Sequence, residues 1–438
     1  MKYYLFVDNF RGFSDTCIPI KDVNFLVGEN STGKTSILGL LKLLSGSGFF
    51  FPPGFDNEHV DFGGFSDLVS AHADDKSSFH VGFIWEESGA RKKRAVVTGS
   101  LFTFEEERGL PKLAKCTFCR GGNKISLRLG KNISYREEEC APMTAEETIA
   151  HLRTLWLREH ISNRDKYTKL LVPPGVSRGL PILLALSFIR DGAKRGRKND
   201  EFTLTPPDVD FLPSLIWLAP IRTKPKRTYD QIAQEIFSPE GSHTPYLIRT
   251  ILRTRSKSSA LKLRNFIEKV GKASGLFQEV RIKNFGRGET VPFELDIVLD
   301  GKALNVTNVG YGVTQALPVL VEILARSNGS WFAIQQPEVH LHPRAQAALG
   351  DLFFELAVDD RKVFLIETHS DFTIDRFRIN YRNARGVKPD SQILFFERCE
   401  RQNKVTPLPI GETGELPSDQ PDSYRRFFIR EQMDILGL

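Results

Sequence analysis

One stretch of the chain has the residue types and the spacing of a loop that binds phosphate groups. Residues 28–35 read GENSTGKT and fill the pattern G-x-x-x-x-G-K-[ST]. Glycines let backbone N–H groups curl around a polyphosphate, a lysine neutralises the terminal phosphates, and a hydroxyl group binds Mg²⁺. We therefore expect ATP and Mg²⁺ as cofactors, with Thr35 as a metal ligand. The expected nucleotide contacts are Gly28, Asn30, Ser31, Thr32, Gly33, Lys34, Thr35 and Ser36.

The segments on both sides of this loop fit the same interpretation. Residues 23–27 form an apolar run typical of a strand, and residues 36–44 have the apolar period of a helix. A helix placed there would aim its N-terminus at the bound anion. The alternative is a glycine-rich turn that arose by chance, which is uncommon when a strand and a helix flank the loop.

A second glycine-rich segment lies far along the chain. Residues 308–318 read NVGYGVTQALP, and Gly310, Gly312, Thr314 and Gln315 lie where a helix is expected to begin. Small residues, a hydroxyl group and a helix N-terminus make a second cradle for phosphate. Two cradles so distant in the chain predict a head-to-tail homodimer that sandwiches ATP. The alternative is a glycine-rich turn before a core helix.

Two further apolar runs end in polar residues. The run 330–334 is followed by QQPEVHLHP, and the run 363–366 is followed by Glu367, Thr368, His369 and Ser370. Both runs predict buried strands. A lone histidine after a strand decides nothing by itself, so the meaning of His369 depends on the motifs around it.

In this order, the motifs resemble those of OLD-like and SMC-like ABC ATPase heads. The segment NFRGF at 9–13 resembles the opening of such heads, which places Arg11 near the nucleotide, with a surface arginine as the alternative. Residues 310–315 resemble the ABC signature, and residues 335–343 resemble the Walker B and D-loop region. By the same resemblance, His369 is the switch histidine that touches the γ-phosphate. Residues 217–225, WLAPIRTKP, resemble a segment of stand-alone OLD-like ATPases.

The chain departs from the family pattern at its acidic positions. Gln335 stands where the family has a carboxylate that steadies Mg²⁺, and Gln336 takes the position of the catalytic base. Glutamine can orient a water molecule but cannot accept its proton. Glu338 is the nearby carboxylate that could replace it. The candidate catalytic residues are therefore Gln336, Glu338 and His369, with Gln335 as a candidate metal contact, and we expect ATP to be held better than it is hydrolysed.

The resemblance implies an α/β fold, namely an ABC-type P-loop NTPase head with two lobes, a side antiparallel sheet and a mainly helical inserted subdomain. Alternating residues between 79 and 129 predict the side sheet. The expected parts are lobe I with the phosphate loop at 1–140, the insert at 141–273, lobe II at 274–390, and a tail of strands and a helix at 391–438.

The insert has two features of its own. A capping box at 144–147 predicts the start of its first helix. Basic clusters lie at 194–198 and 253–257. Such clusters are usually solvated loops and faces, although two in one insert raise the chance of a contact with the phosphate backbone of a nucleic acid.

Composition is that of an ordinary soluble globular protein. Hydrophobic residues make up 40% of the chain and charged residues 26%, and no run approaches the ~18 apolar residues of a membrane span. The first residues resemble a strand rather than a signal peptide, so we expect a cytoplasmic protein without a membrane partner. Cys116 and Cys119 lack the second cysteine pair that a structural zinc site needs, which favours ordinary strand cysteines.

The resemblance implies an ATPase without a nuclease of its own, which forms a homodimer or a higher homo-oligomer around ATP. ATPases of this build serve in bacterial anti-phage defence systems such as Septu, where the ATPase works with a separate HNH nuclease. We therefore expect the sensor or regulatory subunit of such a complex. Two alternatives stay open: an SMC- or RecF-like DNA-repair ATPase that clamps DNA, and an ATP-gated scaffold.

Overall fold

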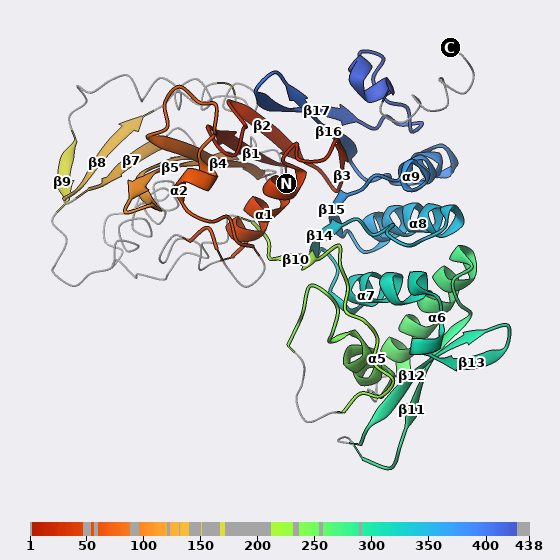
Figure 1. The fold of residues 1–438 in the computed structure, drawn as a ribbon. Coiled ribbons are helices and arrows are strands. Elements are labelled where there is room, and N and C mark those ends of the chain that lie inside the picture. The colour runs from red at the N-terminus through yellow and green to blue at the C-terminus, as the bar shows by residue number, and fades with distance from the viewer. Residues whose placement is uncertain are drawn as a thin grey trace, which may run out of the picture. The chain divides into compact units, whose positions relative to one another are not determined.

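The computed structural model describes most of the 438-residue chain (Figure 1). The described residues are 2–46, 54–56, 60–87, 96–120, 123–130, 132–139, 150, 167–170, 212–230, 236–253, 257–288 and 291–426. The helix expected from residue 144, the basic cluster at 194–198 and residues 254–256 of the second cluster lie outside them.

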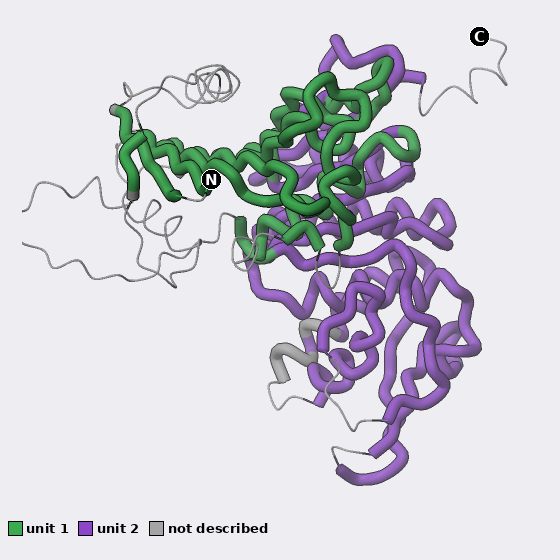
Figure 2. Tube along the Cα trace, turned by 60° about the vertical axis from the view of Figure 1, so that its left-hand side comes forward, with its two compact units in different colours: residues 1–21, 29–214, 396–405 green, residues 22–28, 215–395, 406–438 purple. Residues whose placement is uncertain are grey.

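The chain forms two compact units (Figure 2). Unit 1 contains residues 1–21, 29–214 and 396–405, and unit 2 contains residues 22–28, 215–395 and 406–438. The division into two lobes, an insert and a tail stays a prediction.

Unit 1 is built on an antiparallel sheet in the order β2-β1-β4-β5-β6-β7-β8-β9 (Figure 1). Its strands are β1 (Lys2–Asp8), β2 (Thr16–Ile20), β4 (Ser78–Glu87), β5 (Val96–Glu107), β6 (Leu110–Arg120), β7 (Asn123–Leu129), β8 (Ile133–Glu139) and β9 (Thr168–Leu170). The side sheet expected between residues 79 and 129 is thereby confirmed. Unit 1 also holds α1 (Lys34–Leu44) and the short α2 (Phe65–Leu68).

The core of unit 1 is aromatic. Phe79 of β4 stacks on Phe104 of β5, with 5.2 Å between the ring centroids. Phe10, Phe55 and Phe65 pack against Phe79 with tilted or edge-on rings. Aromatic pairs of this kind contribute about 0.5–1.5 kcal/mol each beyond the area they bury. They hold the loop and helix around residue 65 against β4.

Unit 2 is organised around a sheet in the order β10-β14-β15-β3-β16-β17 (Figure 1). The strands of this sheet are β3 (Val23–Gly28), β10 (Leu215–Leu218), β14 (Trp331–Gln335), β15 (Val363–Glu367), β16 (Ser391–Cys399) and β17 (Gln402–Pro409). Residues 396–405 of the last two strands are counted with unit 1. The first four strands of that order run parallel. All residues of β3 are buried, as expected of a parallel strand that is covered on both faces. The strands expected at 23–27, 330–334 and 363–366 are confirmed.

Helices cover this sheet. Three of them follow its strands or the signature segment: α7 (Tyr311–Ala325), α8 (Pro343–Asp359) and α9 (Asp371–Asn383). Phe353 of α8 packs on Phe364 of β15, and Phe377 of α9 packs on Phe25 of β3, with ring centroids 5.2 and 5.0 Å apart. The helix α8 therefore forms the crossover between the parallel strands β14 and β15.

A smaller sheet completes unit 2. It consists of β11 (Glu279–Asn284), β12 (Phe293–Leu299) and β13 (Lys302–Asn305), with helices α5 (Thr244–Arg253) and α6 (Lys257–Ser274) beside it (Figure 1). The ring of Phe293 joins these parts. Tyr229 stacks on it, Tyr246 meets it edge-on, and the Arg249 guanidinium lies 4.5 Å from its centroid.

A buried charge cluster anchors α7. The carboxylate of Glu322, which is fully buried, contacts His243 Nε2 and accepts a hydrogen bond of 2.8 Å from Arg326 Nε. Burial alone would raise the pKa of Glu322, but the bonds with His243 and Arg326 outweigh it and hold that pKa below its ordinary value. The ionised carboxylate thus fixes the helix to the segment around residue 243.

Cys116 and Cys119 lie three residues apart on β6, so they point to opposite faces of the sheet. Burial raises the pKa of the Cys116 thiol. Across the described ranges, no group of three or more His, Cys, Asp or Glu side chains could together hold a metal ion. In the same ranges, a helix with the length and apolar character needed to cross a membrane is not found.

Candidate functional site

The phosphate loop connects β3 to α1, as expected. Gly28 ends β3 in unit 2, and the residues from Glu29 onward belong to unit 1. Ser31 and Gly33 have left-handed backbones, with φ of +61° and +92°. A Cβ atom on Gly33 would come within 2.4 Å of the Phe13 ring. Both its backbone and its neighbour therefore require a glycine at position 33.

Lys34 is buried against its own loop. Only 3% of its surface is exposed, and its Nζ donates a hydrogen bond of 2.6 Å to the carbonyl of Glu29. The Thr32 hydroxyl donates to the same carbonyl at 2.8 Å. The ammonium group is therefore held at the start of α1, where the helix N-terminus also favours an anion. Thr35 is exposed and Ser36 is half-buried.

Two residues of the β16–β17 hairpin brace this loop. Arg398 Nη2 donates 2.9 Å to the carbonyl of Ser31. Asn403 donates from its backbone N–H to Gly12 O at 2.8 Å and from its side-chain amide to Arg11 O at 3.1 Å. No local sequence pattern points to either residue, because each lies more than 360 positions from its partner in the chain.

Arg11 contacts the segment that follows the loop and α1. Its guanidinium lies 4.9 Å from the centroid of the Phe62 ring, and its Nη1 donates 3.5 Å to Phe62 O. Burial lowers the pKa of Arg11, while the charge of Asp67 raises it. Phe62 and Asp67 are thus described partners of the Arg11 guanidinium, and its contact with a nucleotide stays a prediction.

In unit 2, the carboxyl ends of β14 and β15 bring together the polar residues of two motifs. We refer to Gln335, Gln336, Glu338, Glu367 and His369 as the β14–β15 edge. Gln335 Nε2 donates 3.2 Å to Glu367 Oε2, and the backbone N–H of Gln336 donates 2.7 Å to Glu367 O. Parallel pairing places Gln335 directly beside Glu367. The candidate residues of both motifs therefore lie at one edge of the sheet.

Glu338 is the buried acid of this edge. Its Oε1 accepts a hydrogen bond of 2.7 Å from the backbone N–H of His369. Its Oε2 is buried and has no hydrogen-bond partner among the described residues. Burial raises the pKa of Glu338, and the bond from His369 offsets only part of that rise. A carboxyl group with one unoccupied oxygen can accept a proton or a further donor.

Arg222 fixes the end of β14 from outside the expected motif. This residue, of which 4% is exposed, donates from Nη2 to Gln335 O at 3.2 Å and from Nη1 to Pro220 O at 3.4 Å. Burial lowers the pKa of Arg222 to about 10, and the charge of Glu338 counters part of that shift. The resemblance of residues 217–225 pointed to this segment, but not to the partner of Arg222.

The signature segment begins α7 in unit 2. A Cβ atom on Gly310 would meet nothing within 4 Å, whereas one on Gly312 would lie 3.0 Å from the carbonyl of His340. The Thr314 hydroxyl donates 2.8 Å to Tyr311 O. Thr314 and Gln315 are buried. Gly310 thus lies in open space, while Gly312 is tightly packed against its own chain.

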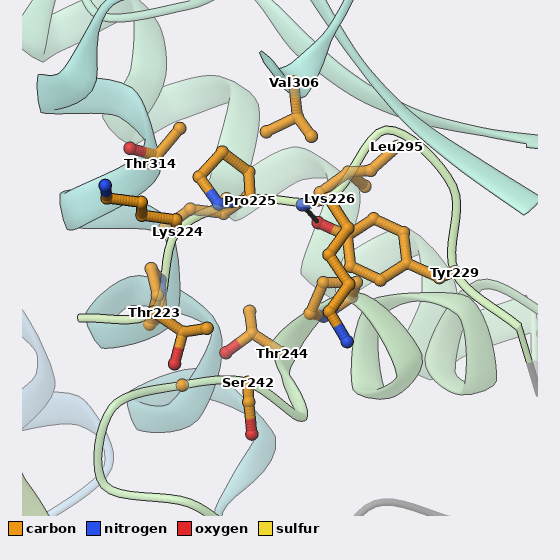
Figure 3. A pocket seen from close by; sticks show the side chains of 14 residues that line it. Thr223, Lys224, Pro225, Lys226, Tyr229, Ser242, Thr244, Leu295, Val306 and Thr314 are labelled. Carbon is orange, nitrogen blue, oxygen red and sulfur yellow. Dashed lines mark hydrogen bonds between the residues drawn. The ribbon is translucent and has the colours of Figure 1, made fainter. Parts of the chain in front are cut away.

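A cavity of about 70 Å³ borders the signature helix (Figure 3). Thr314 of α7 forms part of its wall, together with Lys224 and Pro225 of the neighbouring segment. Thr244 also lines it, and its buried hydroxyl has no hydrogen-bond partner in the described part of the chain. The helix that starts with the signature segment therefore has free space on this side.

The chain is similar to solved structures of SMC heads. An SMC head bound to the C-winged helix domain of ScpA is 11% identical, and the alignment covers 93% of this chain and 98% of that chain with a TM-score of 0.45. The SMC head domain from Thermotoga maritima is 12% identical, with coverage of 93% and 97% and a TM-score of 0.39. A head from Pyrococcus furiosus with an extended coiled coil, bound to the C-terminal domain of ScpA, is 12% identical, with coverage of 100% and 99% and a TM-score of 0.35.

Comparison at the level of sequence gives a family. No curated protein matches the chain. The sequence pattern of the family described as AAA ATPase domain matches residues 1–90 and 223–374, which together make up more than half of the chain. These residues include the phosphate loop, the signature segment and the β14–β15 edge. The chain therefore belongs to the AAA ATPase domain family.

Proposed function

We propose that this protein is an ATPase that binds Mg²⁺ and ATP at its phosphate loop and forms a homodimer, or a higher homo-oligomer, around the nucleotide. The observation that carries the proposal is the buried Lys34, held at the N-terminus of α1 by the Glu29 carbonyl. A lysine ammonium costs free energy to bury unless an anion or strong acceptor repays it. Membership of the AAA ATPase domain family supports ATP as that anion.

Each residue of the site has a role in this proposal. Lys34 neutralises the terminal phosphates, and the Thr35 hydroxyl binds Mg²⁺. When bound, Mg²⁺ withdraws charge from the phosphate oxygens. Glu338 Oε2 is buried and has no hydrogen-bond partner in the described part of the chain, so it can accept a hydrogen bond from a further donor at the β14–β15 edge. His369, exposed directly after β15, contacts the γ-phosphate.

Hydrolysis is slow in this proposal because the acidic positions carry amides. Gln336 can orient the attacking water but cannot take its proton. Glu338 is the nearby carboxyl group, and its raised pKa suits a proton acceptor. ATP would then stay bound for a long time, so the protein would act as a slow timer or a nucleotide-gated sensor rather than undergo rapid cycles of hydrolysis.

Replacing Lys34 tests the phosphate loop. Lys34→Ala removes the ammonium that pairs with the terminal phosphates, so we expect the Kd for ATP to rise about 10–100-fold. Binding of a fluorescent ATP analogue measures this. Lys302→Ala, at an exposed position of β13, is the matched control. Thermal unfolding confirms that both variants fold, and a folded Lys34→Ala protein with the affinity of the parent would disprove the assignment.

Gly310 offers a test of the sandwich. Gly310→Asp adds a negative charge in open space, so the fold should persist while repulsion of the phosphates blocks ATP-dependent dimerisation. Light scattering with and without ATP gives the mass. Gly386→Asp is the matched control, since its added side chain also meets nothing within 4 Å. Equal ATP-dependent dimerisation of the parent and the Gly310 variant would count against the model, and crosslinking would identify any other interface.

Restoring an acid at position 336 tests the slow hydrolysis. Gln336→Glu should raise the rate of phosphate release by up to about 10²-fold, the lower range for general-base catalysis. Gln402→Glu, at an exposed residue of β17, controls for added charge. A parent that already turns over at several per second, in the usual range of enzymes, with no gain from Gln336→Glu, would refute the slow-timer proposal.

The biological role that best fits this ATPase is a sensor or regulatory subunit in bacterial anti-phage defence, with a separate nuclease as effector. Sequence resemblance to OLD-like ATPases of such systems supports this role. A DNA-repair clamp of the SMC or RecF kind is the alternative, and the basic cluster at 253–257 would suit it.

Nuclease assays separate these roles. The purified chain should not cleave DNA or RNA with Mg²⁺ or Mn²⁺, because its assigned residues bind nucleotide and form no nuclease site. Cleavage should appear when the product of a neighbouring nuclease gene is added with ATP. Metal-dependent cleavage by the isolated chain, lost on a point mutation within it, would contradict the proposal. Tight ATP-dependent DNA binding without any nuclease partner would favour the clamp.

A further inference from the structure

Gln335 carries a neutral amide at the position where we expected a carboxylate beside Mg²⁺. Gln335 ends β14, and only 7% of it is exposed. An amide oxygen is neutral, whereas hard cations such as Mg²⁺ are usually held by one or two carboxylates together with phosphate oxygens. If the protein binds Mg²⁺ and ATP as proposed above, a carboxylate should come from elsewhere in the fold.

Glu367 lies directly beside Gln335. The two residues are paired in register on the parallel strands β14 and β15. Their side chains also meet, since Gln335 Nε2 donates 3.2 Å to Glu367 Oε2. Glu367 is buried, with 6% of its surface exposed. The hydrogen bond orients a carboxylate at the place where the neighbouring strand offers only an amide.

The order of strands places Glu367 next to β3, the strand that leads into the phosphate loop, whereas Gln335 is one strand further away. β15 lies between β14 and β3, and Glu367 is paired with Leu26 of β3. The phosphate loop begins at Gly28, two residues after Leu26. The backbone N–H of Thr368 donates 3.2 Å to Leu26 O, which fixes this alignment. In open α/β sheets, ligands bind beyond the carboxyl ends of the strands, and Glu367 occupies such an end.

A second observation points to a ligand at the same edge. The Oε2 atom of Glu338 is buried and has no hydrogen-bond partner among the described residues, although its Oε1 is held by His369 N–H. Burying a carboxylate oxygen without a partner costs free energy, so the edge is arranged for a further cationic or donor group.

We propose that Glu367 supplies the carboxylate on the metal side of the nucleotide, in place of the one that Gln335 does not carry. Its carboxylate binds Mg²⁺ or accepts a hydrogen bond from a water ligand of the ion. The Gln335 amide orients Glu367 through the hydrogen bond between them. In this proposal the carboxylate lies on β15 rather than on β14, one strand nearer to β3. Gln335 and Glu367 remain in contact.

A structural role is the competing explanation. In that case Glu367 only receives the amide of Gln335 and stabilises the paired strand ends. Both explanations predict that Glu367→Gln lowers stability. Only the metal role predicts that the substitution changes the affinity for nucleotide in Mg²⁺ and leaves the affinity in EDTA nearly unchanged.

The decisive experiment measures ATP affinity in Mg²⁺ and in EDTA for four proteins. These are the parent, Glu367→Gln, the exchanged pair Gln335→Glu with Glu367→Gln, and Glu355→Gln, which removes a half-exposed carboxylate of α8. The exchanged pair keeps one amide and one carboxylate in contact but returns the charge to β14. Electron paramagnetic resonance of Mn²⁺ with ATP reports on the metal independently of hydrolysis.

We expect Glu367→Gln to lose about 10–100-fold of affinity in Mg²⁺, the range for groups that hold or orient a metal ligand. The exchanged pair should regain most of it, and Glu355→Gln should match the parent. An unchanged ratio of the two affinities in folded Glu367→Gln would overturn the metal role. If that variant does not fold, a metal-dependent affinity in the exchanged pair supports the proposal and its loss refutes it. A parent that binds no ATP in either buffer would instead refute the proposed function.

Discussion

The hydrogen bonds between the ends of β14 and β15 are the constraint on which the candidate site depends. Gln336 N–H donates to Glu367 O, and the Glu338 carboxylate accepts from His369 N–H, both at 2.7 Å. Gln336 reaches this position only with a left-handed backbone at φ +43°. Such a conformation costs free energy in a residue other than glycine and persists because its surroundings hold it. The two hydrogen bonds consequently hold the loop after β14 against the loop after β15.

Buried charge at this edge explains why a distant segment must be part of it. Glu338, Glu367 and Arg222 are each less than a tenth exposed. Isolated buried ions are unstable, so each needs partners that replace water. Arg222 reaches the edge across 113 positions of the chain to bond Gln335 O, and the charge of Glu338 counters part of the pKa depression that burial imposes on it. The segment after β10 therefore contributes Arg222 to the β14–β15 edge.

The sequence predicts the elements of this site better than the contacts between them. Runs of apolar residues next to glycine motifs were enough to place β3, α1, β14 and β15, because parallel strands buried on both faces read as continuous apolar segments. Arg398 and Asn403 could not be found this way. Their roles depend on where a hairpin folds against a loop more than 360 positions earlier, and no local pattern encodes that. Gly310 and Gly312 show the same limit, since one motif contains an open position and a packed one.

Parallel pairing gives a physical reason why either of two neighbouring strands can present a carboxylate at this edge. Residues in register on neighbouring parallel strands lie about 4.8 Å apart and point to the same side of the sheet. A glutamate side chain is long enough to cover much of that spacing, so Glu367 and Gln335 reach a common volume, as their 3.2 Å contact demonstrates. In the order β14-β15-β3, the carboxylate lies on the strand that adjoins β3, which leads into the phosphate loop. The sequence at the end of β14 offers only the amide of Gln335, whereas the folded sheet places the carboxylate of Glu367 beside it.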